Sequence, residues 1–267
     1  MNQQRSGFFD MERVEVLKGP QVSLYGNSSV GGALSMATKR PEIGDELNGK
    51  FTVKYETEYE ESQVLGGVNI PVSDEVAVRL AGKWRDQAGG AAFNHYTGKT
   101  ENSYEDSAFR IGVVWEPNAD LNVYLRHEQA KFEKHGETLA IYTHVNPDFT
   151  PLENSPLAAF GIGTGDLNTG NDDSIFNNGP SGNYNDSDET MLEVVWQIND
   201  SMSLTSITAD SNYDYYHTLD VDMAPYNFMS TNTPEDYSQF SQELRLDTEI
   251  NDQLNIMAGL YYQDADF

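Results

Sequence analysis

The chain has 267 residues, of which 43 are acidic and 16 basic, and its formal net charge of -27 excludes a general nucleic-acid binder, because polyphosphate would be repelled. The absence of cysteine excludes thiolate catalysis, cysteine-ligated zinc and disulfides. No run approaches the roughly 18 apolar residues of a spanning helix, which excludes a helical membrane protein. A transmembrane β-barrel is not excluded, because its strands need only about 9–11 residues with alternate ones apolar.

The first predicted elements lie in residues 9–41, which read FDMERVEVLKGPQVSLYGNSSVGGALSMATKRP. A short strand rich in β-branched residues spans 13–17, and a second strand spans 33–38 and ends at basic residues and Pro41. Between the strands a compact turn closes at a glycine, and a glycine pair marks a site of unusual backbone dihedrals or close approach. The positions that stop or bend this backbone are Gly19, Pro20, Gly26, Gly31 and Gly32.

From about residue 49 the pattern changes to strands in which apolar and polar residues alternate, which is the signal of a half-buried strand. In one of them Val78 and Leu80 lie on one face and Arg79 on the other. In another, residues 202–213, Ser and Thr occupy both faces, so its orientation stays open. The predicted strands cover about residues 50–56, 64–72, 76–85, 109–116, 121–128, 192–198, 202–213, 240–246 and 254–263.

Tight turns and long connections alternate between these strands. The tight-turn sequences are Ser73-Asp74, residues 117–120, Asn199-Asp200 and Asn251-Asp252. The longer polar stretches are about 86–106, 132–189 and 215–237. Only the first hairpin, turning near Glu60-Glu61, is short on the side of the long connections. We therefore expect all tight turns at one end of the sheet, as in outer-membrane barrels, where that end is periplasmic.

The three tryptophans fit this orientation. If the first strand runs outward, Trp84 falls at the outer end of its strand, and Trp115 and Trp196 fall at the inner ends of theirs. All three lie on the apolar face near the two water interfaces, where aromatic rings form girdles. Chance placement at strand ends is the alternative explanation.

Residues 12–20, ERVEVLKGP, closely resemble the C-terminal part of the plug domain of TonB-dependent receptors. In that family the pattern E-R-[IV]-E-V-[LI]-[KR]-G-P is followed by LYG, a GG pair and a strand that ends T-[KR]-[KR]-P. This chain matches at 24–26, 31–32 and 38–41 as well. The resemblance covers about residues 8–41 specifically and the later strands generically, where 241–246 also looks like a recurrent barrel strand of the family.

The resemblance implies an all-β fold in two parts. Residues 1–43 would be the C-terminal part of a plug domain, and residues 44–267 an incomplete transmembrane antiparallel β-barrel, about nine strands of a 22-stranded type. The family has a signal peptide, a TonB box and the first part of the plug before this motif, and residues 1–30 hold no apolar segment of signal-peptide length. We therefore expect a fragment with two open sheet edges, which does not form a working transporter alone.

The resemblance also implies a function. It predicts TonB-dependent active transport of a bulky, scarce ligand across the outer membrane of a Gram-negative bacterium. Ferric siderophores or related iron complexes are the usual cargo, and haem, vitamin B12 and oligosaccharides also occur. The implied partners are the TonB energy-transducing complex, outer-membrane lipid and lipopolysaccharide, with no cofactor, no nucleic acid and no enzymatic step. Ligand-binding residues stay unassigned, because the plug apices that usually hold ligand precede about residue 8.

Charged residues of the plug segment are candidates for ion pairs with the barrel wall. The resemblance implies that such pairs hold the plug in the barrel and loosen when TonB pulls. The alternative is that these side chains are solvated at the plug surface. The candidates are Arg13, Glu15, Lys18, Lys39 and Arg40 in the plug and Glu193 and Glu243 in the wall.

No metal or catalytic site is predicted. His95, His135 and His144 fall in predicted connections and could contact a ferric complex, but no second ligand stands at metal spacing, and ordinary exposed histidines are the alternative. Residues 166–173 are faintly similar to a calcium loop, yet the glycine stands one place early for an EF-hand and no Glu follows at the twelfth position. No G-x-S-x-G or comparable nucleophile motif occurs.

Two other interpretations compete with the receptor. A soluble, secreted acidic β-protein, acting as an adhesin or a calcium-dependent binding module, would explain the charge and the alternation but not residues 9–41. A passive porin is disfavoured, because porins lack a plug motif.

Overall fold

The computed structural model describes residues 8–20, 31–44, 46–90, 92–94, 98–136, 174–175, 181–220, 230–251 and 253–267, and every regular element in them is a β-strand. In these same ranges no helix has the length and apolar character that a membrane crossing requires. Two strands, β1 (Met11–Lys18) and β2 (Gly32–Thr38), precede the main sheet. A small separate sheet joins β6 (Ala92–Asn94), β7 (Lys99–Glu101) and β10 (Ser174–Ile175).

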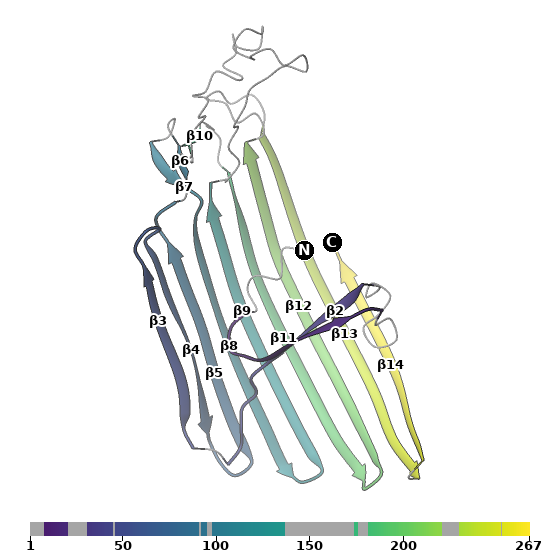
Figure 1. Cartoon of the computed structure of the whole chain (residues 1–267). Coiled ribbons are helices and arrows are strands. Elements are labelled where there is room, and N and C mark those ends of the chain that lie inside the picture. The colour runs from purple at the N-terminus through teal and green to yellow at the C-terminus, as the bar shows by residue number, and fades with distance from the viewer. Residues whose placement is uncertain are drawn as a thin grey trace.

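Nine strands form one antiparallel sheet in the order β14-β13-β12-β11-β9-β8-β5-β4-β3 (Figure 1). Apart from the small sheet, each strand pairs with its neighbours in sequence, and β3 and β14 form the two edges. The unclosed all-β sheet of about nine strands that the sequence predicts is confirmed. The strands are β3 (Asn48–Glu56), β4 (Glu61–Pro71), β5 (Val76–Gln87), β8 (Ser103–Asn118), β9 (Leu121–His135), β11 (Gly182–Asn199), β12 (Met202–Asp220), β13 (Ser230–Asn251) and β14 (Leu254–Asp266).

The predicted tight turns lie together at one end of this sheet (Figure 1). The pairs that close them are Pro71 with Ala77, Asn118 with Leu121, Asn199 with Met202 and Asn251 with Leu254. Because the strands are antiparallel, the other connections leave from the opposite end. We call the two ends the turn end and the loop end.

The strands extend further than the apolar alternation indicates. β9 reaches His135 and β11 begins at Gly182, while β12 reaches Asp220 and β13 begins at Ser230. These ends lie inside stretches that the sequence suggests are connections. Backbone pairing needs only N–H and C=O groups, so a ladder continues where the apolar side chains stop. The alternation reports side-chain burial and therefore underestimates strand length.

The two faces of the large sheet differ in chemistry. One face, which we call the outer face, carries the alternate apolar side chains, and the opposite face carries the hairpin of β1 and β2 and is called the hairpin face. Exposed apolar side chains of the outer face are Phe51, Val53, Trp84, Phe109, Trp115, Leu125, Leu192, Trp196, Leu244 and Leu260. Charged side chains such as Arg79, Lys83 and Arg110 lie on the hairpin face and are buried.

The tryptophans lie where the sequence predicts. Trp115 pairs with Val76, the first residue of β5, and Trp196 pairs with Leu121, the first residue of β9, so both are at the turn end. Trp84 lies towards the loop end of β5. All three are exposed on the outer face.

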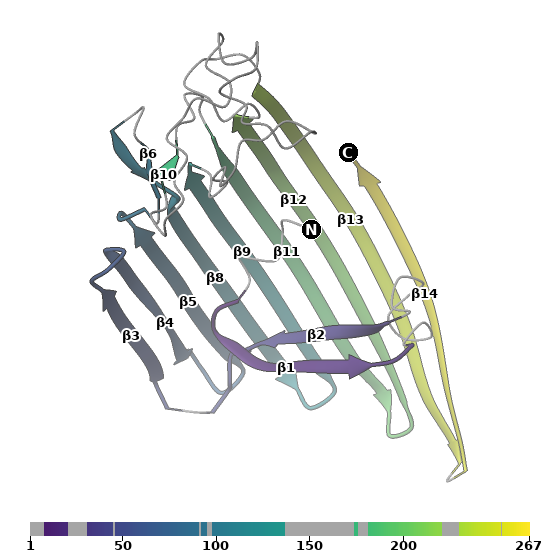
Figure 2. The same ribbon diagram turned by 45° about the horizontal axis from the view of Figure 1, so that its top comes forward.

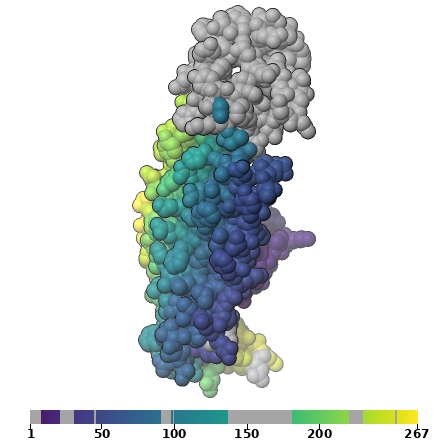
Figure 3. All heavy atoms as spheres, turned by 90° about the vertical axis from the view of Figure 1, so that its left-hand side faces the viewer, coloured from purple at the N-terminus to yellow at the C-terminus, as the bar shows by residue number. Residues whose placement is uncertain are grey.

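β1 and β2 form a separate antiparallel hairpin, which crosses one face of the large sheet (Figures 2 and 3). Val14 pairs with Met36, and the backbone N–H of Lys39 donates to the carbonyl of Asp10 at 3.0 Å, which closes the base of the hairpin. The described residues thus form one large sheet with a hairpin on its charged face. They do not form two apolar faces packed together, as a soluble β-sandwich requires.

Candidate functional site between the hairpin and the sheet

Phe9 occupies a socket of small side chains on the hairpin face. Its side chain is 4% exposed and belongs to a buried cluster with Ala81, Ala108 and Ala130 from the adjacent strands β5, β8 and β9. The Arg110 guanidinium lies 4.3 Å from the Phe9 ring centroid, a cation–π distance. Arg110 also donates a hydrogen bond to the Phe9 carbonyl at 3.2 Å. The residue just before the hairpin is therefore held by both its side chain and its backbone.

Asp10 forms an ion pair with Arg79 of β5. Arg79 Nε and Nη2 donate to the two carboxylate oxygens at 2.6 and 2.5 Å, and each side chain is only 10% exposed. Gly67 of β4 lies against this pair, because a Cβ built there would stand 2.8 Å from Asp10 Oδ1 and 2.9 Å from Arg79 Nη2. The pair therefore requires the flat surface that a glycine provides.

Arg40, which follows β2, contacts the sheet at a second point. Its Nη1 and Nη2 donate to the two carboxylate oxygens of Glu193 on β11 at 2.6 and 3.0 Å. The same guanidinium lies 4.5 Å from the ring centroid of Tyr124, which is 2% exposed. The hydrogen bond to Glu193 raises the pKa of Arg40 and so favours its charged form. A planar guanidinium suits this site, because it can pair with a carboxylate and stack on a ring together.

Pro41 and Glu42 extend this second point. A Cβ on Gly112 would lie 3.4 Å from Pro41 Cδ, so a glycine leaves room for the buried proline. Asn69 of β4 accepts a hydrogen bond from the Glu42 N–H at 2.9 Å and donates one to the Glu42 carbonyl at 3.0 Å. Asn69 is 1% exposed. We call the contacts of residues 9–10 and 40–42 with the sheet the docking contacts.

A cavity of about 470 Å³ lies between the hairpin and the sheet. The hairpin contributes Met11 and Met36 to its lining. The sheet contributes two arginines that are each paired with a carboxylate, Arg110 with Glu128 at 2.6 Å and Arg126 with Glu189. Each of these two guanidinium charges therefore has a carboxylate partner, and the lining holds Asp188 as a third carboxylate. Within the described part of the chain, no group of three or more His, Asp or Glu side chains is placed to hold a metal ion.

The structure separates the charged residues that the sequence suggests for a plug–barrel contact. Arg40 and Glu193 contact each other, as described above. Arg13 pairs with Glu12 and Glu15 of its own strand, at 3.5 and 3.1 Å, and is 57% exposed. Lys18, Lys39 and Glu243 have no ion pair with another described residue, and Glu243 lies on β13 beside Ile207 and Tyr261.

The backbone positions of the motif are only partly described. Gly19 has φ +83° and Gly32 has φ +145°, and a Cβ on Gly32 would lie 2.4 Å from the Leu17 carbonyl oxygen. Gly31 has open space around it and Pro20 ends a described segment. Gly26 lies outside the described residues.

The predicted histidines are dispersed where they are described. His135 ends β9, with Nε2 3.3 Å from a carboxylate oxygen of Glu133. His127 lies on the outer face, with Nδ1 2.9 Å from Thr190 Oγ1. His95, His144 and residues 166–173 lie outside the described residues.

Sequence reasoning missed Phe9, Asp10 and Arg79. A signal for them exists on the charged face of the predicted strands, where small residues recur at alternate positions. Ala77 and Ala81 flank Arg79 on β5, and such small residues leave space for side chains from another segment.

Comparisons with known proteins identify relatives. No protein-family model matches the chain. The ferrioxamine receptor of Yersinia enterocolitica is 29% identical over 117 residues, and the ferric enterobactin receptor of Pseudomonas aeruginosa is 30% identical over 77 residues. These matches cover 43% and 27% of this chain but 15% and 10% of the two receptors. The chain therefore matches a small part of the length of its curated relatives.

Solved structures share the fold. The ferric yersiniabactin uptake receptor FyuA from Yersinia pestis superposes with a TM-score of 0.71 at 17% identity, and the ferric-catecholate import receptor Fiu from E. coli K12 with a TM-score of 0.68 at 16% identity. Each comparison covers 96% of this chain, and 36% and 40% of the respective receptor. The motif of residues 12–20 and the curated relatives make this chain similar in sequence to part of outer-membrane siderophore receptors, and the solved structures show that it shares their fold.

Proposed function

We propose that this chain is a segment of a receptor that imports a ferric siderophore, or a related iron complex, across the outer membrane with energy from the TonB complex. Residues 1–43 form the last part of its plug and residues 44–267 the first part of its barrel wall. The curated relatives are receptors for ferric siderophores of different kinds, ferrioxamine and ferric enterobactin. The proposal therefore names ferric siderophores as the class of ligand and does not name a particular siderophore.

The docking contacts are the observation that carries this proposal. They fix the base of the hairpin to the charged face of the sheet through both of its strands, by Asp10–Arg79 before β1 and by Arg40–Glu193 after β2. One buried ion pair, one half-exposed ion pair and a buried aromatic ring between the hairpin and the wall give a stopper that is held in place without covalent bonds. The ligand would pass without any bond being formed or broken.

The outer face supports a membrane-facing wall. On β5 its apolar residues run from Val76 to Trp84. With a rise of about 3.3 Å per residue and a tilt of about 40°, this stretch is roughly 20 Å tall, close to the roughly 25 Å apolar band of outer-membrane barrels. The opposite face carries Arg79, Lys83 and Arg110, which lipid would not accept.

Iron uptake tests the proposal directly. A strain that lacks the receptor containing this chain is supplied with radioactive iron on hydroxamate, catecholate or mixed siderophores. We expect loss of uptake for at least one of them, restored by the whole receptor and abolished by an uncoupler of the inner-membrane proton gradient. Unchanged uptake of every chelate would refute the assignment.

The isolated chain provides a second test. Its sheet has two unpaired edges, β3 and β14, which lipid cannot satisfy. We expect residues 1–267 alone to restore no uptake and to show no heat-dependent shift in gel migration after mixing with bilayers. Recovery of the chain as a soluble monomer without detergent would favour the secreted binding protein instead.

A further inference from the structure

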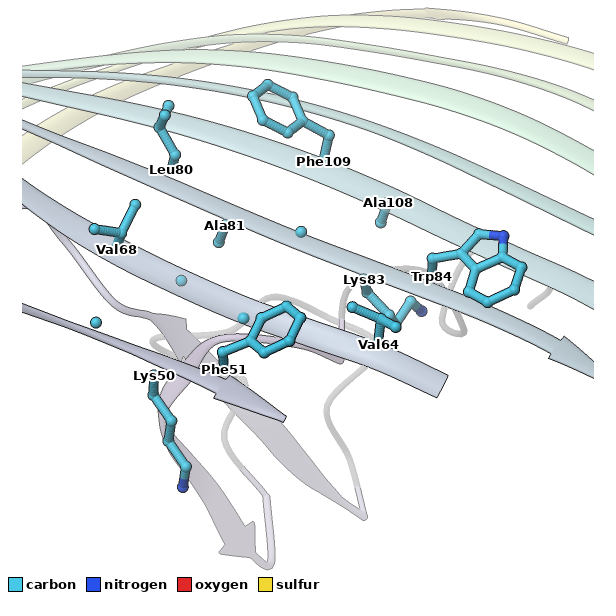
Figure 4. A pocket seen from close by; sticks show the side chains of 14 residues that line it. Lys50, Phe51, Val64, Val68, Leu80, Ala81, Lys83, Trp84, Ala108 and Phe109 are labelled. Atoms are coloured by element: carbon cyan, nitrogen blue, oxygen red, sulfur yellow. The ribbon is translucent and has the colours of Figure 1, made fainter. Parts of the chain in front are cut away.

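The outer face has a hollow of about 570 Å³ over the first residues of β3 and the middle of β4, β5 and β8 (Figure 4). Gly66 and Gly82 are among its lining residues. Phe51, Trp84 and Phe109 stand around it (Figure 4). The remaining outward side chains of its lining are Val64, Val68 and Leu80. The outward-facing lining is therefore apolar.

Strand register explains the hollow. Phe51 pairs with Gly66, Gly66 pairs with Gly82, and Gly82 pairs with Phe109, so one row across four strands reads aromatic, glycine, glycine, aromatic. Side chains of this row point to the outer face, and the two glycines contribute none. The ring of Phe51 leans over Gly66, where a Cβ would stand 3.0 Å from Phe51 Cδ2. The result is a furrow bounded by two phenylalanines.

The position of the hollow in the membrane follows from its row. Val76 and Trp115 mark the turn end of the apolar band, and Trp84 marks the other side of that band. Gly82 lies one outward position from Trp84, so the hollow occupies the half of the band nearer the loop end. In an outer-membrane protein the tight turns are periplasmic and the loop end is extracellular. The hollow therefore faces the outer leaflet.

We propose that this hollow binds an acyl chain of lipopolysaccharide. Lys50 and Lys83 also line the hollow, but the strand register places both on the opposite face, so its outward walls are apolar. An unfilled furrow would forfeit dispersion contacts that a flexible aliphatic chain can supply. The hollow is continuous with the lipid-facing band, and its depth selects the outer leaflet, which is built from lipopolysaccharide. The inference rests on the outer-membrane orientation and is independent of the cargo of the receptor.

Gly82 offers a variant that fills the hollow without disturbing the sheet. A Cβ there meets nothing closer than the Ala108 carbonyl oxygen at 3.7 Å, an ordinary contact. Gly66 is unsuitable, because its Cβ would stand 2.9 Å from the Lys50 carbonyl oxygen. Gly82→Leu therefore fills the hollow, and Gly82→Ala is a milder second variant. Val78→Leu enlarges an outward side chain of the same strand outside the hollow and is the matched control.

Tryptophan quenching measures occupancy. The whole receptor is placed in vesicles of phosphatidylcholine with brominated acyl chains, which quench Trp84 and Trp196 on the outer face. The fluorescence of each tryptophan is obtained by subtracting the fluorescence of the variant in which that tryptophan is replaced by phenylalanine. Unbrominated lipid A is then added, and the change in quenching is measured. Migration of unheated and heated samples on gels verifies that every variant is folded.

We expect lipid A to relieve the quenching of Trp84 at a lower mole fraction than that of Trp196. Gly82→Leu should abolish this difference, Gly82→Ala should reduce it, and Val78→Leu should preserve it. Equal relief at both tryptophans, or a difference that persists in Gly82→Leu, overturns the proposal. Failure of lipid A to relieve Trp84 at all means that phospholipid fills the hollow, and also overturns it.

Discussion

Asp10 and Arg79 lie 69 positions apart in the sequence and form a two-point hydrogen-bonded ion pair of which each side chain is 10% exposed. This pair joins the base of the hairpin to the half of β5 nearer the turn end. Its neighbour Phe9 enters the alanine socket beside it. A force that pulls on the chain ahead of residue 9 would therefore act on Phe9 and Asp10 before it acts on the strands of the hairpin.

The buried ion pair should dominate hairpin docking. We expect Asp10→Asn in the whole receptor to weaken docking by about 3–5 kcal/mol, because Arg79 would keep its charge in a buried site without a partner. Hydrogen exchange of residues 11–18 and 32–38 measures the effect. The control is Arg13→Ala, because the Arg13 side chain is 57% exposed and pairs within its own strand. This substitution should weaken docking by about 0–1 kcal/mol. Similar loss of protection in both variants would contradict the role of the buried pair.

The aromatic ring of Phe9 should matter for packing. We expect Phe9→Ala to lower the free energy of unfolding by about 3–5 kcal/mol, the usual effect of removing a buried phenylalanine side chain and leaving a cavity. Phe8→Ala is the matched control, because Phe8 is 49% exposed. Thermal unfolding of the two variants of the whole receptor, followed by protease sensitivity of the hairpin, compares them. Equal sensitivity of both would argue against the alanine socket as an anchor.

Glycine at position 67 should be required for the docked state. Gly67→Ala places a methyl group against Asp10 and Arg79, and we expect an overpacking cost of about 1–3 kcal/mol. Gly82→Ala on the adjacent strand meets nothing nearer than 3.7 Å and should be close to neutral. Urea midpoints of hairpin exposure in the two variants provide the measurement. A tolerated Gly67→Ala would mean that the pair does not lie against the sheet as described.

Arg40 and Glu193 should be coupled energetically. Because Arg40 is 46% exposed, solvent screens the pair, and we expect a coupling of about 1 kcal/mol in a double-mutant cycle of Arg40→Ala and Glu193→Gln. The same cycle with Glu243→Gln should give no coupling beyond about 0.5 kcal/mol, since Glu243 does not contact Arg40. Hydrogen exchange of the hairpin reads out both cycles. Coupling energies of similar size in the two cycles would indicate a long-range electrostatic effect and not a direct contact between Arg40 and Glu193.

The sequence predicted the sheet well because its signals are local. Alternation of apolar and polar residues and the tight turns at Asn199-Asp200 and Asn251-Asp252 follow from neighbouring residues. Strand ends were predicted poorly, because β11 and β12 continue pairing through polar residues. Side-chain hydropathy does not report backbone hydrogen bonds, so it does not show where the pairing of two strands ends.

The candidate site was only partly predictable. Charge and the family resemblance indicate Arg40 and Glu193 as candidates, and the structure places them in contact. Arg13 and Lys18 carry the same kind of charge but project from the hairpin without an ion pair to the large sheet among the described residues. Charge alone does not distinguish these cases.

The sequence by itself determined the strand order, the opposite chemistry of the two faces and the family motif of the hairpin. Each depends on residues close together in the chain. Only the tertiary structure decided which hairpin residues meet the wall, because pairs such as Asp10 with Arg79 and Arg40 with Glu193 depend on strand register and on how the hairpin crosses the sheet. No local pattern encodes that crossing, so the contacts emerge only when the segments are folded together.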